Sequence, residues 1–473
     1  MFSTSSHRKG TRAIVIGGSM AGLAAARVLQ PHFDQVVILD RDVLSDIPEH
    51  RQGVPQGRHA HGLLAGGLRA LSTLFPTLEA DLRAAGAVAA DVVRDIRWHQ
   101  HGYDKLQFQS GLDGLLLGRP LLEATLRAHV RRLPRVSFAD KVIVQRLLVS
   151  ADGRTVTGVR IRPFGCPEYS CHADLVVDAS GRSSRSPQWL AEQGFEPPPL
   201  DELAVNIGYM TRIYHRRPDD LGGNVGTVIA PRPPHQRRIG FALALEGDRW
   251  IVALGGWMGD HAPADPDGYL AFARSLARPY IYDLISRAEP LSEPVPYAFP
   301  SNRRRRYERV KHLPERFLVM GDALCSFNPI YGQGMSVAAL EALALGDAIS
   351  APDGLTALGA RFFPKAAAIV DGPWAVAAGG DLAFEGVTGR RPAGTALVNW
   401  YLGQVHRAAA TDPDVCLAFF QAANLLAPPT TLFSPKMMAR VAASGWRRPG
   451  TPGPFTRPST TGGLDAQHAV STR

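Results

Sequence analysis

The sequence predicts an α/β fold of two interleaved domains, one with a parallel sheet and one with an antiparallel sheet, followed by a C-terminal helical region. Three observations predict this arrangement. Near the N-terminus, an apolar strand, a glycine-rich turn, a helix and a second strand follow one another within residues 13–39. Residues 203–258 carry several short apolar runs of strand length, which are typical of antiparallel sheets. After Pro373 the apolar spacing is helical again.

The N-terminal unit is predicted from three short segments. Ala13–Ile16 is apolar and of strand length, Gly22–Leu29 contains a run of alanines that favours a helix, and Val36–Leu39 is a second apolar strand. A strand, a helix and a second strand in this order form a βαβ unit, whose two strands are parallel. We therefore expect a Rossmann-like sheet at the start of the chain.

The turn between the first strand and the helix has the pattern Gly17-x-Ser19-x-x-Gly22-x-x-x-Ala26, a dinucleotide-binding fingerprint with one departure. Gly17 permits the tight turn, and Gly22 and Ala26 let the helix pack closely on the sheet. Ser19 replaces the middle glycine, and its hydroxyl is small enough to approach a phosphate and donate to it. Asp40 lies 18 positions after Gly22, where a carboxylate can bind an adenosine ribose. The predicted contacts of this region with a dinucleotide are Gly17, Gly18, Ser19, Met20, Ala21, Gly22, Asp40 and Arg41.

Two later segments also place a turn at the end of a buried strand. In the first, Leu175–Asp178 runs into Ala179-Ser180-Gly181. In the second, Phe317–Met320 runs into Gly321-Asp322, and the glycine-rich stretch Asn328–Met335 then opens a helix. A carboxylate at Asp322 can accept hydrogen bonds from a polyol chain. A glycine-rich helix start stabilises negative charge that lies in front of it.

In this order, the three segments resemble those of the FAD-dependent monooxygenases with the p-hydroxybenzoate hydroxylase fold. Within that family, the chain is similar to the bacterial subgroup of polyether epoxidases and squalene-epoxidase-like enzymes. The resemblance spans roughly residues 12–445. The segments that carry it are Gly17–Ala26, Gly53–Leu63, Gly118–Glu123, Asp178–Ser184 and Gly321–Glu341.

The resemblance implies an oxidoreductase that binds FAD and is reduced by NAD(P)H. Hydroxylases of the family carry an aspartate where this chain has Ser180, so direct NAD(P)H binding and a separate flavin reductase both stay open. In the family, reduced flavin reacts with O2 to form a C4a-hydroperoxide, which transfers one oxygen atom to a double bond or an electron-rich ring. The implied function is epoxidation or hydroxylation of an apolar alkene or aromatic compound of secondary metabolism.

The resemblance also implies individual site residues. Arg58 and His61 lie in a loop near the flavin and are the candidate catalytic residues, with His61 as a proton donor. His59 and His61 have no third ligand at a suitable spacing, so no metal site is expected. The implied FAD contacts beyond the first turn are Arg58, Arg119, Asp178, Gly181, Gly321, Asp322, Gly332, Gly334 and Met335. The candidate substrate pocket contains Tyr209, Phe241, Trp257, Phe327 and Pro329.

Local patterns predict the remaining elements and the domain boundaries. Alternation within Val142–Ile161 predicts a hairpin, and helices are predicted over Leu121–Val130, Tyr269–Ala277, Tyr282–Arg287, Met335–Leu345, Leu397–Ala410, Val415–Leu426 and Lys436–Ala443. The predicted domains are a disordered lead (1–11), an FAD-binding domain (12–200 and 301–372, with parts of 60–115 on the substrate side), a substrate domain (201–300), a C-terminal helical region (373–446) and a disordered tail (447–473).

The apolar positions of the first C-terminal helix are expected to pack on the rest of the protein, with a membrane surface as the alternative. These positions are Leu397, Val398, Trp400, Tyr401, Leu402 and Val405.

Composition limits the location and the partners of the protein. No apolar run approaches the ~20 residues of a membrane span. The N-terminus is polar and basic, and four cysteines are too few for a disulfide framework, so we expect a cytoplasmic protein. The net charge is +9, but no nucleic-acid-binding motif accompanies it. For the basic run Arg303–Arg306, a solvated edge is favoured over contact with an acidic partner such as an acyl-carrier protein, a reductase or a membrane surface.

Four alternatives share part of the pattern. Flavin halogenases share the fold, but they have a tryptophan where this chain has Leu23, and their Trp-x-Trp-x-Ile-Pro stretch is missing. A flavin-dependent reductase of isoprenoid double bonds shares all three segments. A non-enzymatic relative, similar to the prenyl-GTPase escort proteins, has no need of an intact Gly321-Asp322 pair. An NAD-dependent dehydrogenase would use the first turn alone.

Overall fold

The computed structural model describes residues 8–444 of the chain. A five-stranded sheet has the order β18-β12-β1-β2-β8, and all its neighbouring strands are parallel. Its strands are β1 (Gly10–Ile16), β2 (Phe33–Leu39), β8 (Val136–Ala139), β12 (Leu175–Asp178) and β18 (Phe317–Val319). The predicted βαβ unit is thus confirmed. The first strand begins at Gly10, within the predicted disordered lead, while residues 1–7 and the predicted tail lie outside the described residues.

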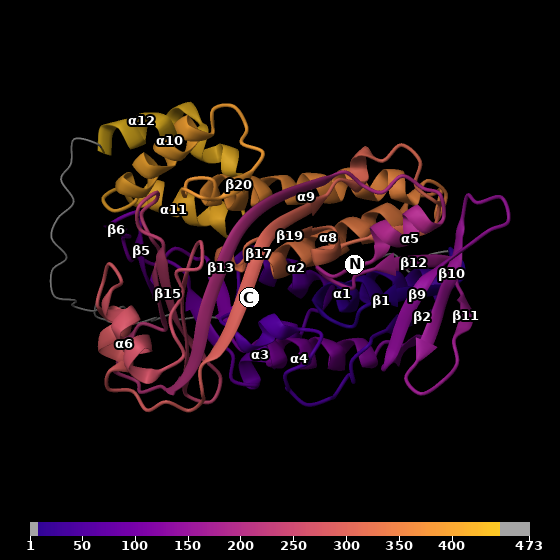
Figure 1. Cartoon of the computed structure of the whole chain (residues 1–473), viewed down its shortest axis with the longest axis horizontal. Helices are drawn as coiled ribbons and strands as arrows, with labels where there is room; N and C mark the ends of the chain where they lie inside the picture. Colours follow the sequence, from indigo (N-terminus) through magenta and orange to yellow (C-terminus); the bar gives the residue numbers. More distant parts are fainter. Residues whose placement is uncertain (1–7, 445–473) are drawn as a thin grey trace, which may run out of the picture.

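Helices and a small meander accompany the parallel sheet (Figure 1). Helix α1 (Met20–Leu29) packs against both α8 (Gly334–Ser350) and α4 (Arg119–Arg131). The antiparallel meander contacts β2 and β12, and it consists of β9 (Val142–Val149), β10 (Val156–Pro163) and β11 (Tyr169–His172). Strands β9 and β10 form the hairpin that the alternation predicts.

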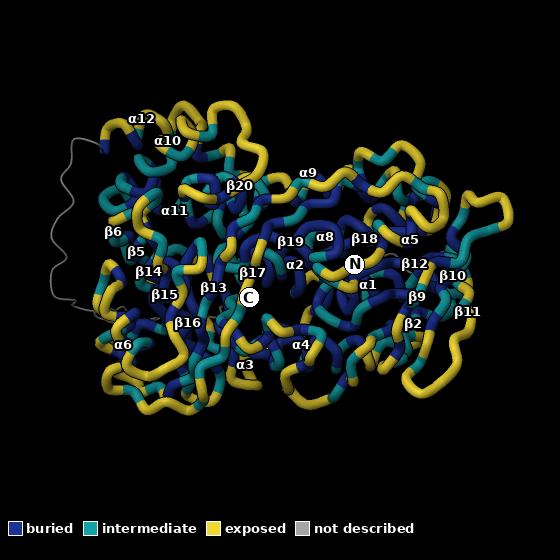
Figure 2. Tube along the Cα trace, in the orientation of Figure 1, coloured by how far each residue is buried: buried dark blue, intermediate teal, exposed yellow. Residues whose placement is uncertain are grey.

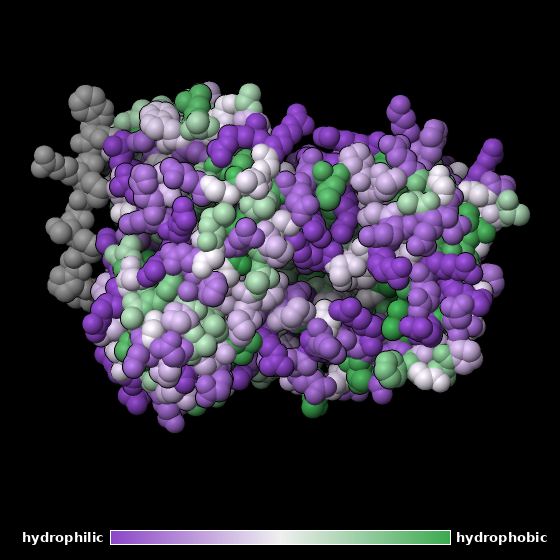
Figure 3. Space-filling view, in the orientation of Figure 1, coloured by the Kyte–Doolittle hydropathy of each residue, from purple (hydrophilic) through white to green (hydrophobic). Residues whose placement is uncertain are grey.

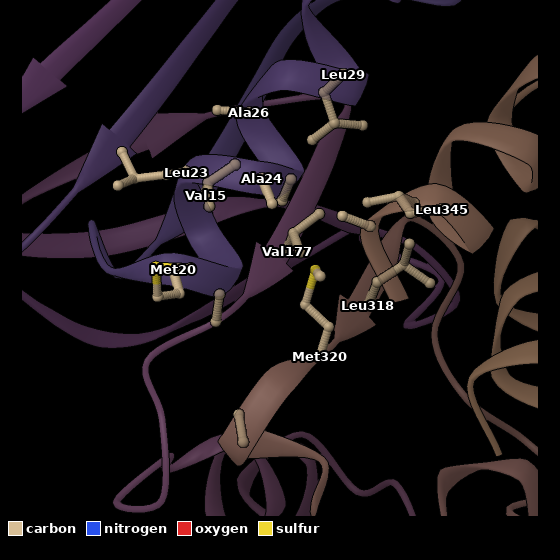
Figure 4. Close-up of a cluster of buried hydrophobic side chains, with 14 of the residues drawn as sticks. Val15, Met20, Leu23, Ala24, Ala26, Leu29, Val177, Leu318, Met320 and Leu345 are labelled. Atoms are coloured by element: carbon tan, nitrogen blue, oxygen red, sulfur yellow. The ribbon is translucent and has the colours of Figure 1, made fainter. Parts of the chain in front are cut away.

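Apolar side chains from distant segments form the core of this half (Figure 4). Val15, Leu23, Val177, Leu318 and Leu345 come from β1, α1, β12, β18 and α8, and each is at most 1% exposed. Burying one such side chain contributes roughly 1.5–3 kcal/mol. The three sequence segments singled out above are therefore held together by their own strands and helices.

A second sheet of nine strands forms the other half of the molecule. Its order is β19-β17-β13-β16-β15-β14-β5-β6, with β20 also paired to β13, and the β14–β5 pairing is parallel. The strands are β5 (Ile96–Gln100), β6 (Tyr103–Asp104), β13 (Leu200–His215), β14 (Gly226–Ile229), β15 (Arg238–Leu245), β16 (Arg249–Gly256), β17 (Val295–Arg305), β19 (Cys325–Ser326) and β20 (Thr388–Gly389). Helices α6 (Pro266–Arg274) and α7 (Tyr280–Ile285) pack on β16 and β15.

Short elements join the two halves. Strand β7 (Asp113–Leu116) pairs with β3 (Gly62–Leu63) and β4 (Val88–Asp91). Leu115 belongs to the core of the parallel sheet and Leu116 to the core of the second sheet, because adjacent strand residues point to opposite faces. Helices α2 (Ala65–Leu74), α3 (Leu78–Ala84) and α5 (Ser186–Glu192) complete this part.

The C-terminal helices differ from the prediction in two respects. Helix α9 (Leu358–Asp381) contains two prolines and continues through the predicted boundary at 372/373. It is followed by α10 (Thr395–Ala408), α11 (Pro413–Ala423) and α12 (Pro435–Ser444), close to the predicted ranges. On α10, Val405 is buried, but Leu397 is 68% and Trp400 61% exposed, so the expectation that these side chains pack on the protein is wrong for the first half of the helix. Figure 3 shows pale and green surface at the upper left of the view, where Figure 1 labels α10 and α12.

The basic run Arg303–Arg306 is largely paired within the chain, which corrects the expectation of a solvated edge. Arg304 is 1% exposed, and its guanidinium lies 2.7 Å from a carboxylate oxygen of Asp371 on α9. Arg306 pairs with Asp201 at 2.6 Å. Contacts with α9 and with acidic residues distant in sequence shield charges that look exposed in the linear pattern.

Burial is concentrated where the two halves meet and in the parallel sheet, whereas exposed residues follow the outer loops and α10 and α12 (Figure 2). Within residues 8–444, no helix combines the length and the apolar character that crossing a membrane requires.

Candidate flavin and substrate site

The dinucleotide turn is built on glycines that cannot be replaced without moving backbone. Gly17 has a φ of 104°, and a Cβ atom there would lie 2.5 Å from the carbonyl oxygen of Ala179. A Cβ on Gly22 would lie 1.8 Å from the carbonyl oxygen of Gly17. The first segment therefore packs directly on the second, and the N-terminus of α1 stands free of a side-chain cap, with its N–H groups oriented as an anion site.

A network of acids and arginines surrounds this turn. The N–H of Gly18 donates to Asp40 Oδ2 at 2.6 Å, and Arg51 bridges Asp40 and Glu123 at 3.3 and 2.7 Å. Arg119 donates to Glu123 at 2.8 Å. Burial alone would raise the pKa of Glu123, but the cations of Arg119 and Arg51 outweigh it and lower the pKa to about 2.

Ser19 belongs to the same network, which changes its predicted role. Its hydroxyl donates to Glu123 and accepts from Arg119 at 3.0 Å, so it is engaged with protein groups rather than held free for a phosphate. Sequence reasoning missed Glu123 and Arg51 as functional residues. Glu123 follows Arg119 by one helical turn, which was an available signal, whereas Arg51 lies in an irregular loop and gave none.

The carboxylate of Asp178 holds its own turn. It is fully buried, and it accepts hydrogen bonds from the N–H of Ser180 at 2.9 Å and from the hydroxyls of Ser184 and Ser186. A direct role of this side chain in cofactor binding is therefore disfavoured. Gly181 has a φ of 85°, and among the described residues no atom lies within 4 Å of a Cβ added there. This segment can therefore offer its backbone groups to a cofactor.

Asp322 lies where the first and third segments meet. A Cβ on Gly321 would lie 2.7 Å from Ala21, and a Cβ on Gly334, the first residue of α8, would lie 3.7 Å from Asp322 Oδ1. Burial raises the pKa of Asp322, against the opposing influence of the cations Arg119 and Arg182. Within residues 8–444 no group donates a hydrogen bond to its carboxylate, so it is free to accept from the hydroxyls of a ribityl chain. These features fit FAD.

A second acid lies directly behind this turn. Glu341 is completely buried in α8, and its Oε2 accepts from the N–H of Gly321 at 2.5 Å. Burial raises its pKa to about 8, so the side chain is a neutral acid at neutral pH. Glu341 therefore supports the Gly321-Asp322 turn without adding a second negative charge to it.

An aromatic group forms where the loop that contains His59 meets strands β13 and β17 of the second sheet. The ring of His59 lies 5.1 Å from that of Tyr209 and 4.9 Å from that of Tyr297, and the two tyrosines stack at 5.1 Å. His59 Nδ1 is 2.9 Å from the hydroxyl of Thr211. Burial lowers the pKa of His59 to about 3, so the imidazole is neutral. A hollow of about 460 Å³ runs along β13 and β17, and Tyr209, Tyr297 and Phe299 are among its lining residues.

The other predicted site residues are divided. Phe241 and Trp257 join the apolar cluster that contains Tyr209 and Tyr297, and Pro329 begins the 3-10 turn in front of α8. Phe327 instead packs in the core of the parallel half, which removes it from the predicted pocket. Arg41 and Arg58 are exposed, and Met335 is buried. Burial and the cation of Arg119 lower the pKa of His61 to about 4, which disfavours it as a proton donor.

The chain is 32% identical over 433 residues to Protein Rv3254 of Mycobacterium tuberculosis, a match that covers 88% of this chain and 89% of that protein. The chain belongs to the family of Rv3254. No family model matches it. Several solved structures are similar to this chain. One is a flavoprotein/dehydrogenase from Cytophaga hutchinsonii, which aligns with a TM-score of 0.64 and 15% identity over 92% of this chain and 98% of that one.

Two further solved structures have the same fold. The flavin-dependent brominase Bmp2 aligns with a TM-score of 0.63 and 13% identity, over 92% of this chain and 98% of that one. The p-nitrophenol 4-monooxygenase PnpA from Pseudomonas putida DLL-E4 aligns with a TM-score of 0.60 and 18% identity, over 88% and 98%. At these identities the likeness establishes the fold, and the predicted fold class is confirmed.

Proposed function

We propose that the protein is an FAD-dependent monooxygenase that inserts one oxygen atom from O2 into an apolar alkene or aromatic compound. The observation that carries the proposal is the position of Asp322. Its carboxylate lies beside the start of α8, is influenced by the cations Arg119 and Arg182, and accepts no hydrogen bond within the described part of the chain. A strand-end carboxylate in this setting suits the ribityl hydroxyls of a flavin.

The residues of the three segments divide the binding of FAD among them. The backbone of Gly17–Gly22 and the N-terminus of α1 would bind the pyrophosphate, and Asp40 the adenosine ribose. Asp322 would hold the ribityl chain, and the Gly332–Gly334 turn at the start of α8 would face the pyrimidine edge of the flavin. When bound, FAD supplies the redox chemistry with O2.

The aromatic group limits the substrate. His59 is neutral because of its burial, and Tyr209 and Tyr297 stack beside it. Such a wall attracts an apolar or aromatic compound and displaces water from the reacting atoms. Neither His59 nor His61 carries a positive charge at neutral pH, so we assign orientation and exclusion of water to this group, and no proton transfer.

The reductant in this proposal is NAD(P)H, which acts either directly or through a separate flavin reductase. The experiment loads the protein with FAD and compares NADPH alone with NADPH and an added flavin reductase, under ¹⁸O2, on a panel of alkenes and aromatic compounds. A product that gains one labelled oxygen atom supports the proposal. A product that gains two hydrogens, or no product in either arm, overturns it.

A brominase with the same fold makes halogenation the second candidate. The same reactions are therefore repeated with bromide or chloride added. A halogenated product, formed in place of the oxygenated one, would move the assignment to a flavin halogenase.

A further inference from the structure

Asp381 joins three parts of the molecule at the last residue of α9. It is completely buried, and the end of α9 lies close to β20 and β13 (Figure 1). Four side chains donate to its carboxylate. Oδ1 accepts from Trp257 Nε1 at 2.9 Å, Asn328 Nδ2 at 2.9 Å and Tyr331 Oη at 3.3 Å, and Oδ2 accepts from Asn302 Nδ2 at 2.6 Å.

These donors come from two different structural units. Trp257 follows β16 and Asn302 lies in β17, so both belong to the second sheet. Asn328 and Tyr331 belong to the turn that precedes α8, which contains the 3-10 helix Pro329–Tyr331. Asp381 therefore accepts two hydrogen bonds from the second sheet and two from the glycine-rich turn.

Two further contacts hold the turn, one to the second sheet and one to α9. The N–H of Asn328 donates to Asn302 Oδ1 at 2.5 Å, and a Cβ on Gly380 would lie 2.3 Å from the hydroxyl of Tyr331. Replacement of the Asp381 carboxylate would leave up to four buried donors without their acceptor, and each such loss costs roughly 1–3 kcal/mol. On its other side, Gln333 Nε2 donates to the carbonyl oxygen of Ala423 at 3.1 Å, whereas Gly332 has a φ of 69° and, among the described residues, no atom within 4 Å of an added Cβ.

We propose that Asp381 is a positioning residue, which fixes the Asn328–Gly334 turn against the second sheet so that this turn and the aromatic wall keep one relative geometry. The inference rests on the proposed function only in its consequence: if the turn faces FAD, then Asp381 sets the distance between the flavin and the substrate. Burial raises the pKa of Asp381 to about 6, so the carboxylate is mainly ionised at neutral pH, when it can accept all four hydrogen bonds.

The test compares Asp381→Asn with the wild-type protein by hydrogen–deuterium exchange of peptides that cover residues 327–334, in the absence of flavin. We expect exchange there to be at least about tenfold faster in the variant, because an amide cannot accept from all four donors. Exchange in β1 and in the middle of α8 is expected to be unchanged. Equal exchange of the 327–334 peptides in both proteins would overturn the proposal.

Asp347→Asn is the matched control, because it makes the same chemical change at an exposed carboxylate on α8. It is expected to match the wild-type protein. Uniformly faster exchange in all peptides of Asp381→Asn would show a general loss of stability and would also count against a positioning role. If Asp381→Asn does not fold, Asn302→Ala and Tyr331→Phe replace it, and unchanged 327–334 exchange in both overturns the proposal.

A second readout separates this inference from the proposed function. FAD affinity, measured by the quenching of flavin fluorescence, is expected to fall by about tenfold in Asp381→Asn. Absence of FAD binding by the wild-type protein would overturn the proposed function and leave the exchange result standing. Normal FAD binding together with unchanged exchange would overturn the positioning role alone.

Discussion

Two buried carboxylates, one at the dinucleotide turn and one at the end of α9, are held by different chemistry. Glu123, at the dinucleotide turn, lies between the cations Arg119 and Arg51, and its pKa falls to about 2. Asp381, beside the second sheet, has four neutral donors, and burial raises its pKa to about 6. Cationic partners keep a buried acid charged at any physiological pH, whereas neutral donors fix its position and leave its charge sensitive to pH.

The largest expected effect on stability comes from replacing Glu123, the acid held by two arginines. Glu123→Gln would leave Arg119 and Arg51 buried beside an uncharged side chain, which should lower the free energy of unfolding by about 3 kcal/mol. Urea denaturation at pH 7 measures this. A loss below about 1 kcal/mol would show that the arginines find other partners and that the network is not the main support of the turn.

Asp322 should behave in the opposite way, with a large effect on binding and little on stability. Its carboxylate makes no recorded hydrogen bond within residues 8–444, so Asp322→Ala should leave the free energy of unfolding of the flavin-free protein within about 1 kcal/mol of wild type. The same variant should lose FAD, with an affinity at least about a hundredfold weaker. Stoichiometric FAD in this variant would contradict the assignment of the third segment.

The pH dependence of stability should separate the two buried acids. The folded-state pKa of Asp381 is raised from 3.8 to about 6, so its contribution to stability is greatest below 3.8 and is lost as the pH rises to 6. The folded-state pKa of Glu123 is lowered from 4.5 to about 2, so its contribution is fully present above 4.5 and is lost as the pH falls toward 2. The contributions of the two carboxylates to stability therefore change in opposite directions as the pH falls.

Between pH 7 and pH 4.5, the difference in unfolding free energy between wild type and Asp381→Asn should therefore grow, by on the order of 1–2 kcal/mol. The difference between wild type and Glu123→Gln should stay constant over the same range. Urea denaturation at both pH values checks this. If the difference from wild type in unfolding free energy changed equally with pH for the two variants, the two acids would not differ as described.

The smallest effects are expected on the exposed face of α10. Trp400 is 61% exposed, so Trp400→Ala should change the free energy of unfolding by less than about 0.5 kcal/mol. Val405 is fully buried on the same helix, and Val405→Ala should cost about 1–3 kcal/mol in a thermal unfolding experiment. Equal costs would mean that the exposed face of α10 is covered in solution.

The strand-and-turn segments could be predicted from sequence because their constraints are local. Gly17, Gly22 and Gly321 permit backbone approaches that a side chain would block, and each approach is visible in the folded chain. Asp381 could not be found in this way, because its donors lie 50 to 124 residues away and each is ordinary in its own segment. The same holds for the buried Arg304, whose ion pair with the exposed carboxylate of Asp371 depends on how β17 meets α9.

If the three segments form one FAD site, the purified protein binds FAD stoichiometrically, and its flavin content measures this. The protein is denatured after incubation with excess FAD and removal of the unbound fraction, and the released flavin is identified and quantified by chromatography. We expect about one FAD for each chain. Protein that retains no flavin after this treatment would contradict it.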